Sequence, residues 1–148
     1  MNKFTFRLQS LLDIRTHQED QRRMELGVVV SQKARVEEEL RRRDTARRDL
    51  LLESYSDHGM SYVQQRQQQA DYAQRLEHEI HTLNEEIVQL EEDRLAAVGR
   101  YNEARKRASA LEKLRERRHQ AYRLLSKREE QTRLDDVAIN LRRERGAL

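Results

Sequence analysis

Two histidines, His78 and His81, come closest in this sequence to the spacing of a metal site. They stand one helical turn apart beside Glu77, so on a helix the three side chains could hold one face of a metal ion. A protein zinc site needs further ligands, and the chain has no cysteine and no additional ligand at a matching spacing. Polar residues on a helix surface explain the pair better. We therefore predict no metal site and no cofactor.

Acid–base or nucleophilic chemistry has no better support in the sequence. The paired carboxylates Glu85-Glu86 and Glu91-Glu92 fall in a run of helix-forming residues. A solvated helix offers neither the pocket nor the desolvation that would tune a carboxyl group for catalysis. The sequence contains no glycine-rich phosphate loop and no arrangement typical of an activated nucleophile. We predict that the protein is not an enzyme.

The basic stretch from Arg105 to Arg133 raises the alternative of a helical nucleic-acid binder. This stretch overlaps the end of a heptad pattern and lacks interleaved aromatic residues that could contact bases. We keep nucleic-acid binding as a second alternative and expect no nucleic acid among the partners.

An apolar seam organises the chain from Ala73 to Leu125. Alternate steps of three and four residues connect sixteen positions, and only three arginines interrupt their apolar character. The positions are Ala73, Leu76, Ile80, Leu83, Ile87, Leu90, Arg94, Ala97, Tyr101, Ala104, Ala108, Leu111, Arg115, Arg118, Tyr122 and Leu125. A heptad kept over this length predicts a long helix that buries a narrow stripe against another helix.

The composition supports a coiled coil over a layered domain. Of 148 residues, 39% are charged and 5% aromatic, the mean hydropathy is -1.10, and proline is absent. The sustained heptad argues against disorder, which such a polar chain would otherwise suggest. The longest apolar runs fall far below the roughly 20 residues that span a bilayer, so we expect no direct membrane insertion. The interrupted apolar start does not resemble a secretory signal, and we predict a cytoplasmic protein.

The helix boundaries follow from the turn-forming residues. Residues 54–61 form the only cluster of turn formers, and Ser61 with Gln64 matches a capping box. We predict one coiled-coil domain over residues 1–148, with a first helix at about 3–54 and a turn at about 55–61. A second helix is expected at about 61–138, followed by a frayed tail at 140–148.

Two helices joined by a short turn should fold back as an antiparallel pair. Reflection of the chain about His58 places Leu76 opposite Leu40. It also places Arg94 opposite Arg22, within a turn of Glu19 and Glu25, which predicts a salt bridge across the seam. The first helix then runs out near residue 112. The expected fold class is all-α, a long two-helix antiparallel coiled-coil hairpin with an overhanging C-terminal helix.

Charge is segregated along the chain. Lys and Arg number 12 against 10 Asp and Glu in residues 1–53, 4 against 9 in residues 54–100, and 14 against 8 in residues 101–148. An uneven charge distribution of this kind also arises without a function. It is, however, what we expect if the two ends of the rod bind different partners.

In the order and spacing of several motifs, this sequence resembles the flagellar type III export protein FliJ family. These motifs are the opening FTFRLQSLLDIR, the tyrosine-bearing turn, the heptad helix, and the closing LEKLRERRHQAYRLLSKREEQTRLDD. The resemblance implies an antiparallel coiled coil similar to the stalk of rotary ATPases. It implies three partners: the hexameric export ATPase, the cytoplasmic domain of the export gate, and export chaperones. The implied location is the cytoplasmic face of the inner membrane, with a role in flagellum biogenesis and motility.

The resemblance also implies two sets of partner-binding residues. For the export gate they are Leu51, Tyr55, Tyr72 and Leu76, although Glu79 and Leu83 depart from the residues of relatives farther along that face. For the ATPase ring they are Phe4, Phe6, Leu8, Arg115, Arg118, Tyr122 and Leu125. The remaining alternative is a generic coiled-coil tether or chaperone that self-associates through Ala73 to Leu125.

Overall fold

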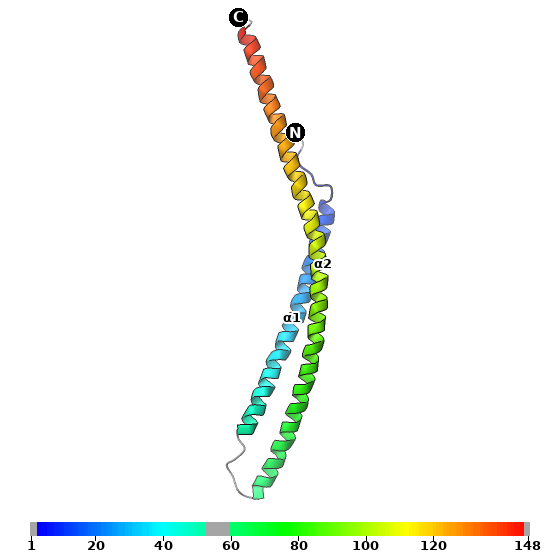
Figure 1. Ribbon diagram of the computed structural model, residues 1–148, viewed down its shortest axis with the longest axis vertical. Helices are drawn as coiled ribbons and strands as arrows, with labels where there is room; N and C mark the ends of the chain where they lie inside the picture. The colour runs from blue at the N-terminus through cyan, green and yellow to red at the C-terminus, as the bar shows by residue number, and fades with distance from the viewer. Residues whose placement is uncertain (1–2, 53–59, 147–148) are drawn as a thin grey trace. The chain divides into compact units, whose positions relative to one another are not determined.

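The computed structural model describes residues 3–52 and 60–146, with side chains from residue 62 onward in the second range. Two helices account for nearly all of these residues: α1 runs from Gln9 to Leu52 and α2 from Met60 to Gly146 (Figure 1). The described residues contain no strand. This confirms the predicted all-α fold of two helices that pack against each other. The predicted turn falls on residues 53–59 and lies outside the described residues.

The N-terminal helix begins later than expected because residues 3–8 form a non-helical arm. We call this segment the N-terminal arm. The amide of Gln9 donates to the carbonyl oxygen of Phe6 at 3.0 Å, which closes the turn that leads into α1. Phe4 and Phe6 are two residues apart, so on a helix their rings would point about 200° from each other. A non-helical arm lets both rings pack on α2.

At the other end, α2 continues to Gly146, past the expected end near residue 138. Residues 141–145, Leu-Arg-Arg-Glu-Arg, are all residues that favour helix. Arg143 and Arg145 lie in the last turn, where cations interact favourably with the negative end of the helix dipole. Gly146 is the last described residue of α2.

The chain divides into two compact units. Unit 1 comprises Met1–Glu19 and Glu103–Leu148, and unit 2 comprises Asp20–Asn102. Each unit contains parts of both helices. Each therefore buries its own section of the predicted seam.

In unit 2, α1 and α2 run antiparallel (Figure 1). The seam residues of α2 are the ones that become buried. Leu76 and Ala97 are each 1% exposed and Ile80 is 8% exposed. The other seam positions of this unit are half-buried: Ala73, Leu83, Ile87, Leu90, Arg94 and Tyr101. The heptad spacing thus identified the buried stripe correctly over its whole length in unit 2.

The predicted register of the two helices is wrong by about two helical turns. Lys33 contacts Glu91, Arg43 contacts Glu79, and Glu25 contacts Arg100. The residue numbers in these pairs add to between 122 and 125, whereas reflection about His58 requires 116. The predicted pairing of Leu76 with Leu40 is therefore incorrect.

The error arises because the reflection assumed that both helices reach the turn at the same level. With the observed register, Leu52 at the end of α1 lies opposite about residue 72 of α2. The first turns of α2 have no α1 residues opposite them, and residues 63–68 are exposed accordingly. The expected salt bridge of Arg94 to Glu19 or Glu25 is replaced for the same reason, since Lys33 is the α1 residue at that level.

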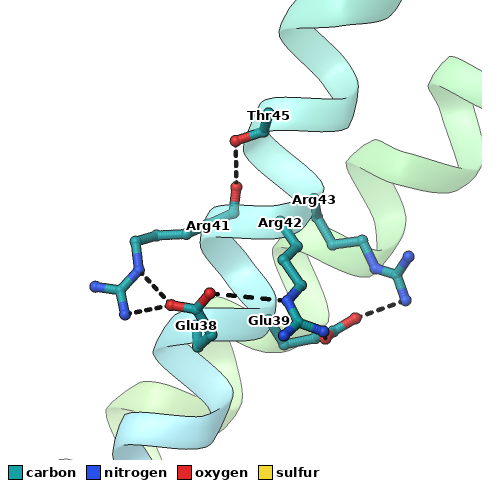
Figure 2. Close-up of polar contacts among 6 residues, drawn as sticks. All are labelled: Glu38, Glu39, Arg41, Arg42, Arg43 and Thr45. Atoms are coloured by element: carbon teal, nitrogen blue, oxygen red, sulfur yellow. Dashed lines mark hydrogen bonds and ion pairs between the residues drawn. The ribbon is translucent and has the colours of Figure 1, made fainter.

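A run of charges on α1 is neutralised within its own helix (Figure 2). Arg41 pairs with Glu38 at 2.6 Å, and Arg43 pairs with Glu39 at 2.8 Å. Arg42 lies 3.7 Å from Glu38 and 4.0 Å from Glu39. These pairs span three or four residues, the distances at which helix side chains are neighbours. The run is therefore a solvated surface, apart from the bridge of Arg43 to α2.

In unit 1, the N-terminal arm and the start of α1 cover α2. Phe6 is 7% exposed, Leu12 4% and Ala108 0%. This cover reaches Tyr122, which is half-buried, so it ends about ten residues later than the predicted limit near residue 112. The arm makes the difference, because it continues the cover beyond the helical part. From residue 127 to residue 146 every described residue of α2 is exposed, which is the predicted overhang.

Candidate functional site

Aromatic contacts fix the N-terminal arm to α2 in unit 1. The Phe4 ring lies 5.0 Å from the His119 ring, edge to face, and 5.5 Å from the Tyr122 ring. The guanidinium of Arg118 lies over the Phe6 ring at 5.8 Å from its centroid. Aromatic pairs at these distances are favourable beyond the area that they bury. The arm is therefore a packed part of unit 1.

These contacts bring together most of the residues predicted to bind the ATPase ring. Phe4, Leu8 and Tyr122 are half-buried, and Phe6 is buried. Arg115 and Arg118 are exposed, so they can reach a partner. Leu125, which is 57% exposed, is also on the surface but makes no recorded contact with the arm.

A hollow lies beside Phe4, with a volume of about 650 Å³. Phe4, Glu112, Lys113, Arg115, Glu116 and His119 line it. Only Phe4 and Arg115 of these were among the predicted site residues. His119 was missed because it lies one position off the seam, and its role depends on an arm whose conformation the heptad pattern does not describe.

The surface of unit 1 is basic, and most of its cations are not used inside the unit. Unit 1 carries 17 Lys and Arg against 10 Asp and Glu, while unit 2 carries 13 against 17. Between Glu103 and Arg128 of α2, the ion pair recorded within the described part of the chain joins Arg107 to Glu103 at 3.8 Å. Every Lys and Arg of this segment is exposed, although Arg118 also lies over the Phe6 ring, so the segment offers positive charge to an anionic partner.

The residues predicted to contact the export gate are less well grouped. Leu51 is 70% exposed near the end of α1, and Tyr72 is 40% exposed, with Arg75 over its ring at 5.9 Å. Tyr55 lies outside the described residues. Leu76 is 1% exposed, so it belongs to the core of unit 2, and the surface at this end is formed by its neighbours.

The two residues that depart from relatives on this face also have internal roles. Glu79 forms an ion pair with Arg43 at 2.9 Å, which joins α2 to α1. Leu83 is a half-buried seam residue. Among the described residues at this end of unit 2, the exposed large apolar side chains are Leu51, Leu52, Val63 and Tyr72.

A three-residue charge cluster crosses the seam of unit 2. Lys33 Nζ lies 2.8 Å from Glu91 Oε2, and Arg94 donates two hydrogen bonds to the same carboxylate, at 2.8 and 2.7 Å. The hydrogen bonds from Arg94 and then from Lys33 lower the pKa of Glu91 from 4.5 to about 2. The seam arginine is thus neutralised by a carboxylate on its own helix that also binds the opposite helix.

The charge cluster should make the stability of unit 2 sensitive to acid. Because the pKa of Glu91 is lower in the folded state, its contribution is complete above about pH 4.5 and is lost as the pH falls toward about 2. We expect Glu91→Gln to lower the urea midpoint at pH 7 and to reduce the loss of stability between pH 4.5 and 2. Glu92→Gln, at the exposed neighbouring position, should change neither. Equal acid sensitivity of Glu91→Gln and the unmodified chain would contradict this assignment.

The other candidate chemistry finds no geometric support in the described residues. His81 Nε2 lies 3.3 Å from Glu85, which is a surface pair on α2. No group of three or more His, Cys, Asp or Glu side chains that could hold a metal occurs within residues 3–52 and 62–146. Neither α1 nor α2, as far as they are described, contains a segment long and apolar enough to span a membrane.

The chain matches a known protein family over nearly its whole length. Residues 4–147, nearly the whole chain, match the family model described as Flagellar FliJ protein. No curated protein and no solved structure matches the chain.

Proposed function

Because the chain belongs to the flagellar FliJ protein family, we propose that it is a noncatalytic, stalk-like component of the flagellar type III export apparatus. In this proposal unit 1 binds the hexameric export ATPase. The turn end of unit 2 contacts the cytoplasmic domain of the export gate. Export chaperones are further partners, and the protein is held at the cytoplasmic face of the inner membrane through the export apparatus.

The observation that carries the ATPase part of the proposal is the surface of unit 1. The N-terminal arm and α2 together present Phe4, Arg115, Arg118 and Tyr122 beside an open hollow. A single helical end inserted in a six-fold ring cannot match every subunit at once. Its contacts should therefore be adaptable and polar, and exposed arginines have the reach and the hydrogen-bond donors for this. The excess of cations in unit 1 supports the same interpretation.

The gate part of the proposal rests on the exposed apolar residues at the turn end of unit 2. Leu51, Leu52, Val63 and Tyr72 have exposed fractions of 70, 82, 67 and 40%. Exposed apolar and aromatic side chains often mark a protein-binding surface. The negative charge balance of unit 2 differs from that of unit 1, as expected if the two units bind chemically different partners.

Self-association is a second candidate, but not through the predicted seam from Ala73 to Leu125, because its positions from Ala73 to Leu111 are already buried or half-buried within the chain. One observation favours another surface for it. Leu134, Val137 and Leu141 lie on one side of the uncovered part of α2, at positions i, i+3 and i+7, and each is at least 54% exposed. A second copy of the chain could bury this stripe. The two functions differ in what they require, since only the first needs the export ATPase.

The test uses the whole chain with purified export ATPase and gate domain from the same organism. We expect the chain to raise the rate of ATP hydrolysis saturably and to bind the gate domain at a separate site, so that both partners bind together. Self-association would be favoured instead if the chain neither changed the rate of ATP hydrolysis nor bound either partner. Sedimentation should then show dimers whose fraction rises with the concentration of the chain.

A further inference from the structure

Two of the four glycines of the chain stand inside helices without a packing reason. Gly59 lies outside the described residues, and Gly146 is the last residue of α2. The other two, Gly27 in α1 and Gly99 in α2, are exposed. A Cβ atom at either position would meet nothing within 4 Å, and neither residue has a positive φ. Neither close packing nor backbone conformation therefore requires glycine there.

The two glycines lie at the same level of the helix pair in unit 2. Glu25 contacts Arg100, and the guanidinium of Arg23 lies over the Tyr101 ring. The residue numbers of these pairs add to 124 or 125, which places Gly27 opposite residue 97 or 98. Gly99 is only one or two residues farther along α2, about 3 Å at 1.5 Å per residue.

β-branched residues adjoin both glycines. Gly27 is followed by three valines, residues 28–30, and Gly99 is preceded by Val98. Glycine and β-branched residues are less favourable in helices than the Arg, Glu, Gln and Leu that fill the rest of the chain.

An ion pair between α1 and α2 at this level joins exposed side chains. Arg100 lies 3.9 Å from Glu25, and the centroid of the Tyr101 ring is 5.9 Å from the Arg23 guanidinium. Farther toward the turn, the ion pairs that join α1 and α2 are 2.8 and 2.9 Å long. The buried residue at the glycine level is Ala97, whose small side chain contributes little apolar contact.

We propose that the helix pair of unit 2 contains a built-in point of flexure at the level of Gly27 and Gly99. Glycine weakens both helices there, and because the two glycines coincide, both helices can bend at one level while the ion pairs nearer the turn, Lys33–Glu91 and Arg43–Glu79, are kept. Had the glycines stood at different levels, each would have been held straight by a regular helix beside it. A flexure of this kind lets the helix pair yield under lateral load at a defined place.

Hydrogen exchange of the whole chain tests the local weakness. In the unmodified chain, amides of residues 24–31 and 96–103 should exchange faster than those on the turn side of this level, such as residues 80–90. Gly27→Ala and Gly99→Ala should each slow exchange in both segments by about five-fold, the equivalent of the propensity difference between the two residues. Asn84→Ala, at an exposed position away from this level, should leave the two segments unchanged.

Spin labels test the bending itself. Cysteines at Val88 and Asn102 bracket Gly99, and cysteines at Gln74 and Val88 bracket an equally long segment without glycine. Both pairs span 14 residues, about 21 Å on a helix. We expect a broader distance distribution for the first pair than for the second. The Gly27→Ala, Gly99→Ala double variant should narrow the first distribution and leave the second unchanged.

Three results would overturn the proposal. The first is equal exchange of the glycine segments and residues 80–90 in the unmodified chain. The second is slower exchange spread evenly over unit 2 in the alanine variants, which would mean a general gain in helix stability. The third is a distance distribution across Gly99 that is as narrow as the control and insensitive to the double substitution.

Discussion

Replacement of Leu76 by alanine should lower the free energy of unfolding by about 2 to 4 kcal/mol, because Leu76 is the largest side chain that the structure buries completely. Leu76, on α2, packs against the last turns of α1. No further layer of side chains lies there that could collapse into the cavity left by the substitution. Urea denaturation followed by circular dichroism at 222 nm measures the change. The slope of free energy against urea concentration should stay the same if only stability is affected.

Leu95→Ala is the matched control for this experiment. It makes the same chemical change in the same helix, but Leu95 is 57% exposed, so the expected change is within about 0.5 kcal/mol. The pair of variants also separates packing from recognition at the turn end. Leu76→Ala should retain gate binding at a temperature where it is folded. A loss of binding in a fully folded Leu76→Ala variant would return this residue to the gate-binding set.

The heptad spacing was sufficient to predict which residues of α2 are buried. From Ala73 to Leu111 every seam position is buried or half-buried, including Arg94. The spacing reflects the period of about 3.6 residues per turn of a helix. Because the sequence contains no proline, this period continues without a break along α2. Arg115 and Arg118, where charge enters the seam, are also the first exposed seam positions.

The register and the arm could not be predicted in this way. A heptad repeats every seven residues, so a shift of one repeat leaves apolar residues opposite apolar residues, and the seam alone does not distinguish neighbouring registers. The specific contacts between Lys33 and Glu91 and between Arg43 and Glu79 distinguish them. Of the site residues, Leu76 was assigned to a surface although its seam position already indicated burial. His119 became visible only once the arm was placed beside it.

Loss of Arg115 and Arg118 should separate binding of the ATPase from stability of the protein. Both side chains are exposed, so their removal relieves no buried charge. The stability of the Arg115→Ala, Arg118→Ala variant should fall slightly, by about 0.5 to 1 kcal/mol, because Arg118 no longer lies over the Phe6 ring. Affinity for the export ATPase should fall at least about ten-fold, as expected when two charged contacts at an interface centre are lost. Titration calorimetry measures the affinity.

Arg35→Ala, Arg48→Ala removes the same charge from exposed positions of α1 in unit 2 and is the control for net charge. It should bind the ATPase with nearly unchanged affinity.

The unmodified chain should also bind the ATPase more weakly as the salt concentration rises from about 50 to 300 mM, since the Debye length falls from about 14 to 6 Å and exposed charge pairs are screened. The Arg115→Ala, Arg118→Ala variant should show a smaller salt effect, because fewer of its contacts are ionic. If instead both double variants weaken binding equally, the ATPase responds to the overall charge of the chain, and the surface formed by the N-terminal arm and α2 is not the specific contact. If the Arg115→Ala, Arg118→Ala variant unfolds but binds normally where it is folded, the two arginines stabilise unit 1 and the ATPase contacts another part of it.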